Sequence, residues 1–159
     1  MIVSRTMDAD LVKSVCFVPQ VWETIAEDGQ TQEEWEPDMS EGWFIAEEHD
    51  DLVGLFNLHV KNCITLEIHP MILPGKRGRP AYQAVMSLWK YLVENTGYSK
   101  IVCFVPDIYR NVKLFAMSCG MKEEGLLTKS YLKNGTITDQ WCLGITRSEI
   151  EAKLNGQNH

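Results

Sequence analysis

Hydrophobic residues in the first half of the chain fall into runs that predict strands. Two runs, Trp43–Glu47 and Leu52–Val60, are joined by the polar residues 49–51, which is typical of a hairpin. A short strand is expected at residues 2–3 and another at residues 64–69. The pattern therefore predicts three antiparallel strands in sequence after a first short one.

Apolar residues at a spacing of three and four predict a long helix after Pro80. They are Ala81, Val85, Leu88 and Leu92. Proline suits the first helical position, because its missing N–H has no acceptor there. Gly97 is expected to end this helix in the left-handed conformation.

A shorter helix follows a predicted strand at residues 100–105. Its expected buried stripe is Val112, Phe115, Ala116 and Cys119, and Gly120 closes it. Two more strands are predicted at residues 124–133 and 136–145, and Asn134-Gly135 between them is the strongest hairpin signal in the chain.

Two helices are predicted near the N-terminus, one capped by Asp8 and ended by Pro19, the next over Val21–Asp28. The acidic stretch Gln30–Glu41 is expected to be a loop. It is either a solvated surface or a negative lip beside a binding site, and a negative lip would favour a cationic amine.

The predicted elements begin with strands and continue with a strand, a helix, a strand, a helix and two strands. This is not the order of a simple alternating α/β fold. It predicts a mixed α/β (α+β) domain with a mostly antiparallel sheet and one parallel pair across the long helix. One domain over residues 1–147 and a C-terminal tail over residues 148–159 are expected.

Composition narrows the possible functions. The net charge of −7 argues against general nucleic-acid binding. No apolar run reaches the ~20 residues of a membrane helix, and no signal peptide is visible, so we expect a cytoplasmic protein. The five cysteines have no paired spacing and are expected to be small buried apolar residues, and no metal is expected.

The turn at Leu73–Pro80 carries Arg77 and Arg79 and opens the long helix. Amides at a helix start have no intrahelical acceptor, and the helix dipole favours an anion there. The turn is therefore a candidate phosphate site. The alternative is a basic surface turn that only starts a helix.

Residues 1–147 resemble the GNAT superfamily of acetyl-CoA-dependent N-acetyltransferases, in particular a phage and prophage branch. The matching motifs are Glu67-Ile-His-Pro70, Leu73-Pro74 with Arg77-Gly78, Ile101–Pro106, Phe115-Ala116, Gly120-Met121 in the place of Gly-Phe, and Asp139-Gln140. The resemblance implies a central sheet of six to seven strands with helices on both faces. It also implies a splayed parallel pair that admits the pantetheine arm of the cofactor.

The resemblance implies that acetyl-CoA binds along this turn. The implied contacts are Ile72, Leu73, Arg77, Gly78, Arg79, Ala81 and Tyr82, with Tyr109 or Asn111 on the arm's other side. Amides near Ile72 and Leu73 are expected to hold the oxyanion. Pro80 and Tyr82 stand where the family has glycines, so the amides of Gly78, Arg79, Ala81 and Tyr82 and the arginines would have to compensate.

Glu67 and His69 lie two apart on a predicted strand and therefore on one face. The resemblance implies a base role for Glu67, with His69 as a partner. Alternatively, the two pair with each other or with Arg77 to orient the turn. Ala116 stands where many family members have a tyrosine acid.

Two functions follow. One is transfer of an acetyl group from acetyl-CoA to a primary amine of a small molecule or a protein, by direct attack. The other is a non-catalytic GNAT-like phage protein that binds CoA or acts as a virion or host-interaction module. Neither nucleic acid nor membrane is an expected partner, and a homodimer is left open.

Overall fold

A computed structural model describes residues 1–157 of the chain. The chain groups into two compact units. One comprises residues 1–59 and 68–87, and the other comprises residues 60–67 and the chain from Leu88 onward.

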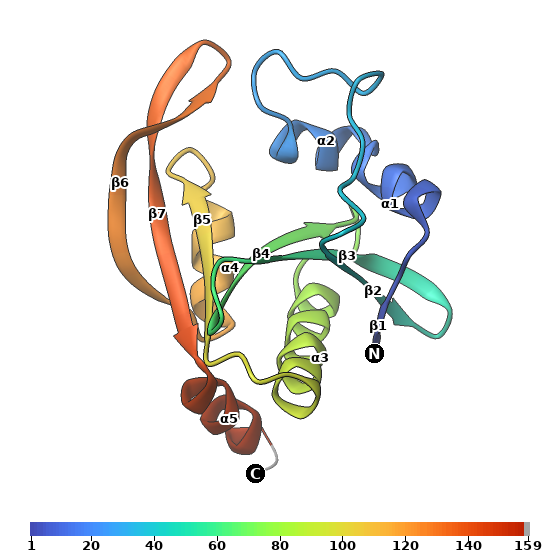
Figure 1. Ribbon diagram of the computed structural model, residues 1–159, viewed down its shortest axis with the longest axis vertical. Coiled ribbons are helices and arrows are strands. Elements are labelled where there is room, and N and C mark those ends of the chain that lie inside the picture. The colour runs from blue at the N-terminus through green and yellow to red at the C-terminus, as the bar shows by residue number, and fades with distance from the viewer. Residues whose placement is uncertain (158–159) are drawn as a thin grey trace. The chain divides into compact units, whose positions relative to one another are not determined.

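The first unit contains an antiparallel meander. Strand β1 (Ile2–Arg5) pairs with β2 (Gly42–Glu48), and β2 pairs with β3 (Asp51–Val60), as Figure 1 shows. The turn between β2 and β3 contains His49 and Asp50, both with positive φ. These strands confirm the predicted hairpin and its short N-terminal neighbour.

Two helices pack on the strands of this unit and share an apolar cluster with them. Helix α1 (Ala9–Cys16) begins as predicted at Asp8, whose carboxylate accepts hydrogen bonds from the amides of Asp10 and Leu11. Helix α2 (Pro19–Ile25) begins at Pro19, so this proline starts a helix rather than ending one. The buried cluster consists of Val12, Val15, Cys16, Val21, Trp43, Leu55 and Met71.

Seven strands form one sheet in the order β1-β2-β3-β4-β5-β7-β6. Strand β4 (Thr65–Ile72) pairs in parallel with β5 (Lys100–Pro106), from Thr65 opposite Lys100 to Glu67 opposite Val102. This paired segment is three residues long, although β4 has eight residues. The predicted mixed, mostly antiparallel sheet with one parallel pair is confirmed.

Helix α3 (Arg79–Asn95) connects these two strands. The predicted left-handed cap at Gly97 is wrong, since Gly97 is not among the glycines with positive φ. Instead, the guanidinium group of Arg147 donates hydrogen bonds to the carbonyl oxygens of Thr96 (2.8 Å) and Val93. A distant cation therefore satisfies the end of this helix.

Strands β6 (Lys122–Lys133) and β7 (Thr136–Thr146) form the long hairpin drawn in orange in Figure 1. Asn134 and Gly135 have φ values of 52° and 74°, as the predicted two-residue turn requires. Strand β7 also pairs antiparallel with β5.

Helix α4 (Arg110–Ser118) lies between β5 and β6 in the chain. None of its nine described residues is fully buried, and Val112 is 41% exposed, so the predicted buried stripe is wrong for this helix. Cys119, just beyond the helix, is buried, and Gly120 closes the helix with a φ of 101°, as predicted.

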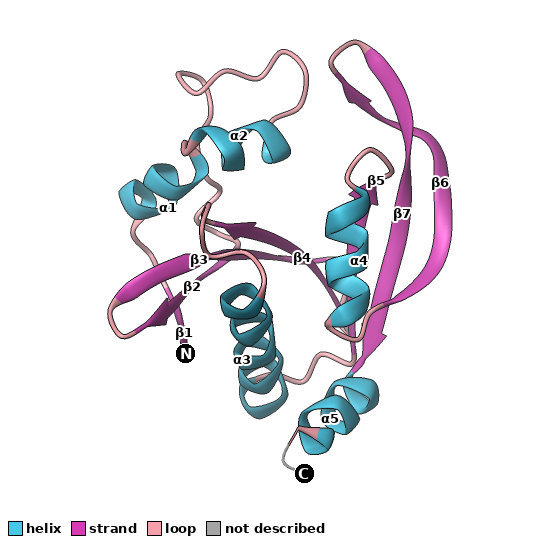
Figure 2. Cartoon of the chain, turned by 180° about the vertical axis from the view of Figure 1, so that it is seen from behind, coloured by secondary structure: helices cyan, strands magenta, loops and turns pink. Residues whose placement is uncertain are grey.

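The predicted tail contains a capped helix, α5 (Arg147–Gly156), which directly follows β7 (Figure 2). The hydroxyl of Thr146 accepts from the amide of Glu149, and the Glu149 carboxylate accepts from the amide of Thr146. Ile150 is buried, so α5 contributes to the core of its unit.

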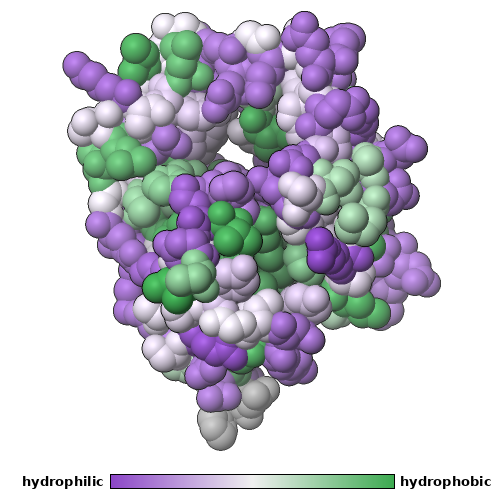
Figure 3. All heavy atoms as spheres, viewed as in Figure 1, coloured by the Kyte–Doolittle hydropathy of each residue, from purple (hydrophilic) through white to green (hydrophobic). Residues whose placement is uncertain are grey.

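Hydrophobic and hydrophilic side chains are interspersed on the face shown in Figure 3. Within residues 1–157, no helix is long and apolar enough to cross a membrane. Cys63 is exposed, contrary to the prediction for the cysteines, while Cys16, Cys103 and Cys119 are buried.

Candidate functional site

The basic turn connects β4 to α3 within the first unit. Two glycines give it its shape, Gly75 with a φ of 81° and Gly78 with a φ of 83°. The amide of Lys76 donates to the carbonyl of Leu73 (3.0 Å), which closes the first bend. The chain thus needs glycine at both positions, because other residues rarely adopt positive φ.

Three cations lie on this turn, and one has a partner of its own. The ammonium group of Lys76 forms an ion pair with the carboxylate of Asp51, at the start of β3. Arg77 and Arg79 are exposed. Their guanidinium groups are therefore the ones placed to contact an anion from solvent.

The amides of Gly78, Arg79, Ala81 and Tyr82 were predicted to donate to a phosphate, and the structure separates them into two pairs. The amide of Ala81 donates to the carbonyl of Lys76 (3.1 Å), and the amide of Tyr82 donates to that of Gly78 (3.0 Å). The prediction is therefore wrong for these two amides. Gly78 and Arg79 precede the first intrahelical bond, and their amides are the ones suited to a ligand.

The last residues of β4 present their amides to alternate edges of the strand. Leu73 donates to the carbonyl of Val53 in β3 (3.0 Å), so its amide is engaged and its predicted oxyanion role is wrong. The amide of Ile72 points to the opposite edge, because successive N–H groups of a strand alternate. Pro70, on that same edge, has no N–H to donate.

Glu67 and His69 occupy one face of β4, while Leu66 and Ile68 are buried on the other, as predicted. A carboxylate oxygen of Glu67 lies 3.3 Å from the ammonium nitrogen of Lys61, and the Glu67 side chain is 13% exposed. The structure thus gives Glu67 a cationic partner that the sequence analysis did not identify.

Tyr109 and Asn111, predicted to contact the cofactor's arm, lie at the start of α4 in the second unit. Tyr109 is the N-cap residue and makes no capping bond with its side chain, and Asn111 is exposed. The carboxylate of Asp107, two residues before the N-cap, accepts a hydrogen bond from the hydroxyl of Thr138. The two predicted residues therefore flank a helix start that no side chain caps.

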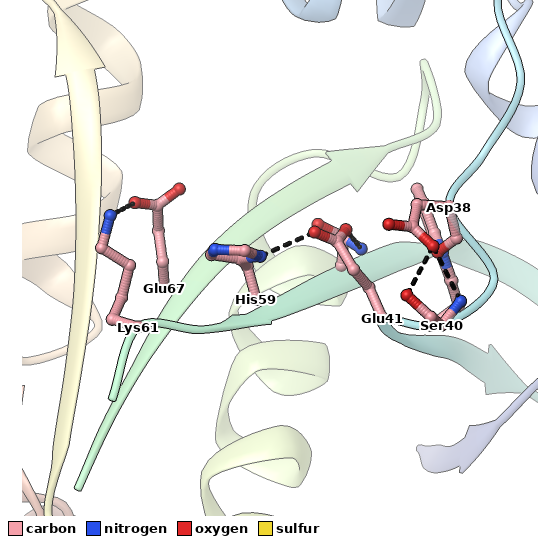
Figure 4. Close-up of polar contacts among 8 residues, drawn as sticks. Asp38, Ser40, Glu41, His59, Lys61 and Glu67 are labelled. Atoms are coloured by element: carbon pink, nitrogen blue, oxygen red, sulfur yellow. Dashed lines mark hydrogen bonds and ion pairs between the residues drawn. The ribbon is translucent and has the colours of Figure 1, made fainter. Parts of the chain in front are cut away.

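A histidine–carboxylate pair that sequence reasoning missed lies in the first unit (Figure 4). Nδ1 of His59 is 2.7 Å from one carboxylate oxygen of Glu41, and the amide group of Asn57 donates to the other oxygen at 2.8 Å. Asn57 and His59 alternate along β3, whereas Glu41 precedes β2. Polar residues two apart on an otherwise apolar strand were the available signal.

The end of the acidic loop is ordered by specific bonds. The carboxylate of Asp38 accepts hydrogen bonds from the amide (2.9 Å) and hydroxyl (2.6 Å) of Ser40, drawn in Figure 4. These bonds to Ser40 lower the pKa of Asp38 below its usual value. The indole of Trp43 donates to the carbonyl of Asp38 at 2.9 Å, so this part of the loop has a fixed conformation.

Solved structures share this fold. A spermidine N-acetyltransferase from Vibrio cholerae in complex with CoA and spermine is 20% identical, with a TM-score of 0.78 over 94% of this chain and 97% of that one. A spermidine/spermine N-acetyltransferase from the same organism, in complex with manganese ions, is 19% identical, with a TM-score of 0.75 over 96% of this chain and 95% of that one. The chain therefore has the GNAT-type fold that its motifs predicted.

The particular family follows from the sequence. A model described as "Protein of unknown function (DUF2824)" matches residues 12–156, and the chain belongs to that family. A relative, "Putative protein p31" of Acyrthosiphon pisum secondary endosymbiont phage 1, is 23% identical over 99 residues. That match covers 62% of this chain and 64% of the relative, so the chain spans less than two thirds of p31.

Proposed function

We propose that this protein transfers an acetyl group from acetyl-CoA to a primary amine by direct attack of the amine on the thioester. The observation that carries the proposal is the basic turn at the start of α3, on a fold shared with a spermidine N-acetyltransferase in complex with CoA and spermine. The structural similarity to that enzyme supports the fold. The arginines and the helix-start amides of the turn are suited to bind a phosphate group.

The cofactor's phosphates would bind at Arg77, Gly78 and Arg79. The two guanidinium groups supply charge-assisted hydrogen bonds, and the amides of Gly78 and Arg79 have no intrahelical acceptor. The amide of Ile72 would donate to the extended arm of the cofactor. Tyr109 and Asn111 are further proposed contacts of the cofactor.

Acetyl transfer requires a neutral amine, so a group at the site must remove a proton from the ammonium form. Glu67 and His69 are the proposed proton-handling residues of β4. The leaving thiolate has a pKa near ~8.5 by analogy with cysteine, so the step is feasible without a strong acid. A reaction without a strong acid is consistent with Ala116, which stands where a tyrosine acid is expected.

The acceptor we propose is a cationic amine. The segment that ends at Glu41 is acidic, and its carboxylates include the fixed Asp38. A negative surface raises the local concentration of cations and lowers that of anions. Polyamines and lysine side chains are the acceptor classes that meet this requirement.

A binding function without catalysis is the second candidate. Ala116 supplies no acid, and Ala81 and Tyr82 use their amides within the turn. A GNAT-like phage protein that binds CoA, or that acts in a virion or on a host protein, needs neither group. The similarity to p31, a phage protein, supports a phage-related role of this kind.

An acceptor screen separates the two candidates. The protein is incubated with acetyl-CoA and with spermidine, spermine or a lysine-containing peptide, and the products are analysed by mass spectrometry. The proposal predicts one acetyl group on at least one amine, formed only with protein present. Binding of acetyl-CoA without transfer to any of these amines would favour the second candidate.

A further inference from the structure

We infer that His59, held by Glu41, is the residue that accepts the proton of the attacking amine. The inference rests on the proposed acetyl transfer and adds to Glu67 and His69 a proton-accepting residue that the sequence analysis did not identify. Its basis is the contact of Glu41 with His59, shown in Figure 4, together with the hydrogen bond from Asn57 to Glu41, all within the first unit.

The contact fixes which ring nitrogen is basic. An ionised carboxylate only accepts hydrogen bonds, so Nδ1 of His59, 2.7 Å from the Glu41 oxygen, must carry the proton. In a neutral imidazole the other nitrogen, Nε2, then has the lone pair. Glu41 thus sets the tautomer in which His59 can accept a proton.

Glu41 is itself held in place. Its second oxygen accepts from the side-chain amide of Asn57 at 2.8 Å, and Asn57 is buried, with 6% of its surface exposed. The Glu41 side chain is 25% exposed, against 46% for His59. The carboxylate, held by Asn57, therefore orients the imidazole ring of His59.

His59 is exposed and lies on the face of the sheet that also carries His69. The bond from Leu73 to Val53 sets an antiparallel register in which His69 of β4 lies opposite Asn57 of β3. Residues directly opposite share a face, as do residues two apart on one strand. His59 therefore shares its face with His69, on the strand that leads into the basic turn.

Glu67 is less suited to be the first proton acceptor. Its carboxylate is 3.3 Å from the ammonium nitrogen of Lys61. This carboxylate is therefore already engaged in an ion pair, whereas the contact of His59 with Glu41 uses Nδ1 and leaves Nε2 to accept a proton.

The proposed step conserves protons and electrons. Nε2 of His59 removes a proton from the acceptor ammonium and releases it to solvent. The amine lone pair forms a C–N bond to the thioester carbon, the C–S bond breaks, and its electron pair leaves on the CoA sulfur. His59 takes a second N–H proton from the nitrogen, and this proton neutralises the thiolate.

The test compares His59→Gln, Glu41→Gln and the control His49→Asn, which alters an exposed histidine in the turn between β2 and β3. With an acceptor that the parent acetylates, His59→Gln should lower kcat roughly 100-fold without weakening acetyl-CoA binding. Glu41→Gln should also lower kcat, Glu41→Asp should recover part of it, and the control should match the parent.

Two further measurements cover the case in which His59→Gln fails to fold. Added imidazole should raise the rate of His59→Ala and not that of the parent. In the parent, imidazole ¹⁵N shifts should show His59 protonated at Nδ1 and not at Nε2. A proton on Nε2 alone, or an active parent matched by a folded His59→Gln, would overturn the inference. A parent that acetylates no amine would instead contradict the proposed function.

Discussion

Lys76 and Asp51 form an ion pair that fastens the basic turn to the start of β3. The pair uses one of the turn's three cations for structure, so an anionic ligand would depend on Arg77 and Arg79. The cations of this turn therefore have two roles, one in holding the turn to β3 and one in binding an anion. Single substitutions can distinguish these roles.

The first prediction is that Arg77→Glu weakens acetyl-CoA binding by about tenfold or more, because it replaces a charge-assisted contact with repulsion. Calorimetry or a ligand-induced thermal shift measures the change. Lys90→Glu is the control, since Lys90 is an exposed cation within α3, the helix that follows the turn. An unchanged thermal shift for Arg77→Glu would place the site elsewhere.

The second prediction concerns Gly78→Val. A Cβ at Gly78 has open space around it, but the φ of 83° is strained for any other residue. We expect a loss of stability of about 1 kcal/mol from this strain and a larger relative loss of acetyl-CoA binding. Gly97→Val, at a glycine with open space and no positive φ, should leave both unchanged. A variant that binds like the parent would remove Gly78 from the site.

The third prediction concerns β4. Glu67→Gln and His69→Ala should each lower the acetylation rate more than they lower cofactor affinity. If the two residues act in one proton path, the double variant should cost less than the sum of the singles. Steady-state kinetics at several pH values measures this, and equal rates for Glu67→Gln and the parent throughout would exclude Glu67 from the path.

The fourth prediction is a pH dependence of stability at α5. Hydrogen bonds from Lys122 and from Thr146 lower the pKa of Glu149 from 4.5 to about 2. A lowered carboxyl pKa stabilises the folded state above pH 4.5, and this contribution is lost as the pH falls toward 2. Glu149→Gln should therefore melt below the parent at neutral pH, and the difference should shrink in acid. A difference that stays constant down to pH 2 would contradict the assignment.

Local signals account for the parts of the fold that the sequence predicted. Asn134 and Gly135 adopt positive φ by themselves, so the hairpin they form needs no distant partner. The carboxylate of Asp8 likewise caps α1 through amides two and three residues away. The strand, turn and helix around Arg77 follow from spacing for the same reason.

The mistaken predictions depend on residues far apart in the chain. The end of α3 is satisfied by Arg147, 51 residues from Thr96, and spacing near Gly97 cannot show that. Glu41 and His59 are separated by 18 residues and meet because β2 and β3 pair. Pairwise contacts of this kind require the register of the sheet, which one sequence does not specify.

Titration of the protein with acetyl-CoA in a calorimeter tests the central claim most directly. The account predicts saturable binding that Arg77→Glu weakens and Lys90→Glu leaves unchanged. When the same sample is afterwards supplied with spermidine, spermine or a lysine-containing peptide, at least one of these amines should give heat of turnover and free CoA. Absence of any binding by the folded parent would contradict the account, because neither acetyl transfer nor CoA recognition at the turn could then hold.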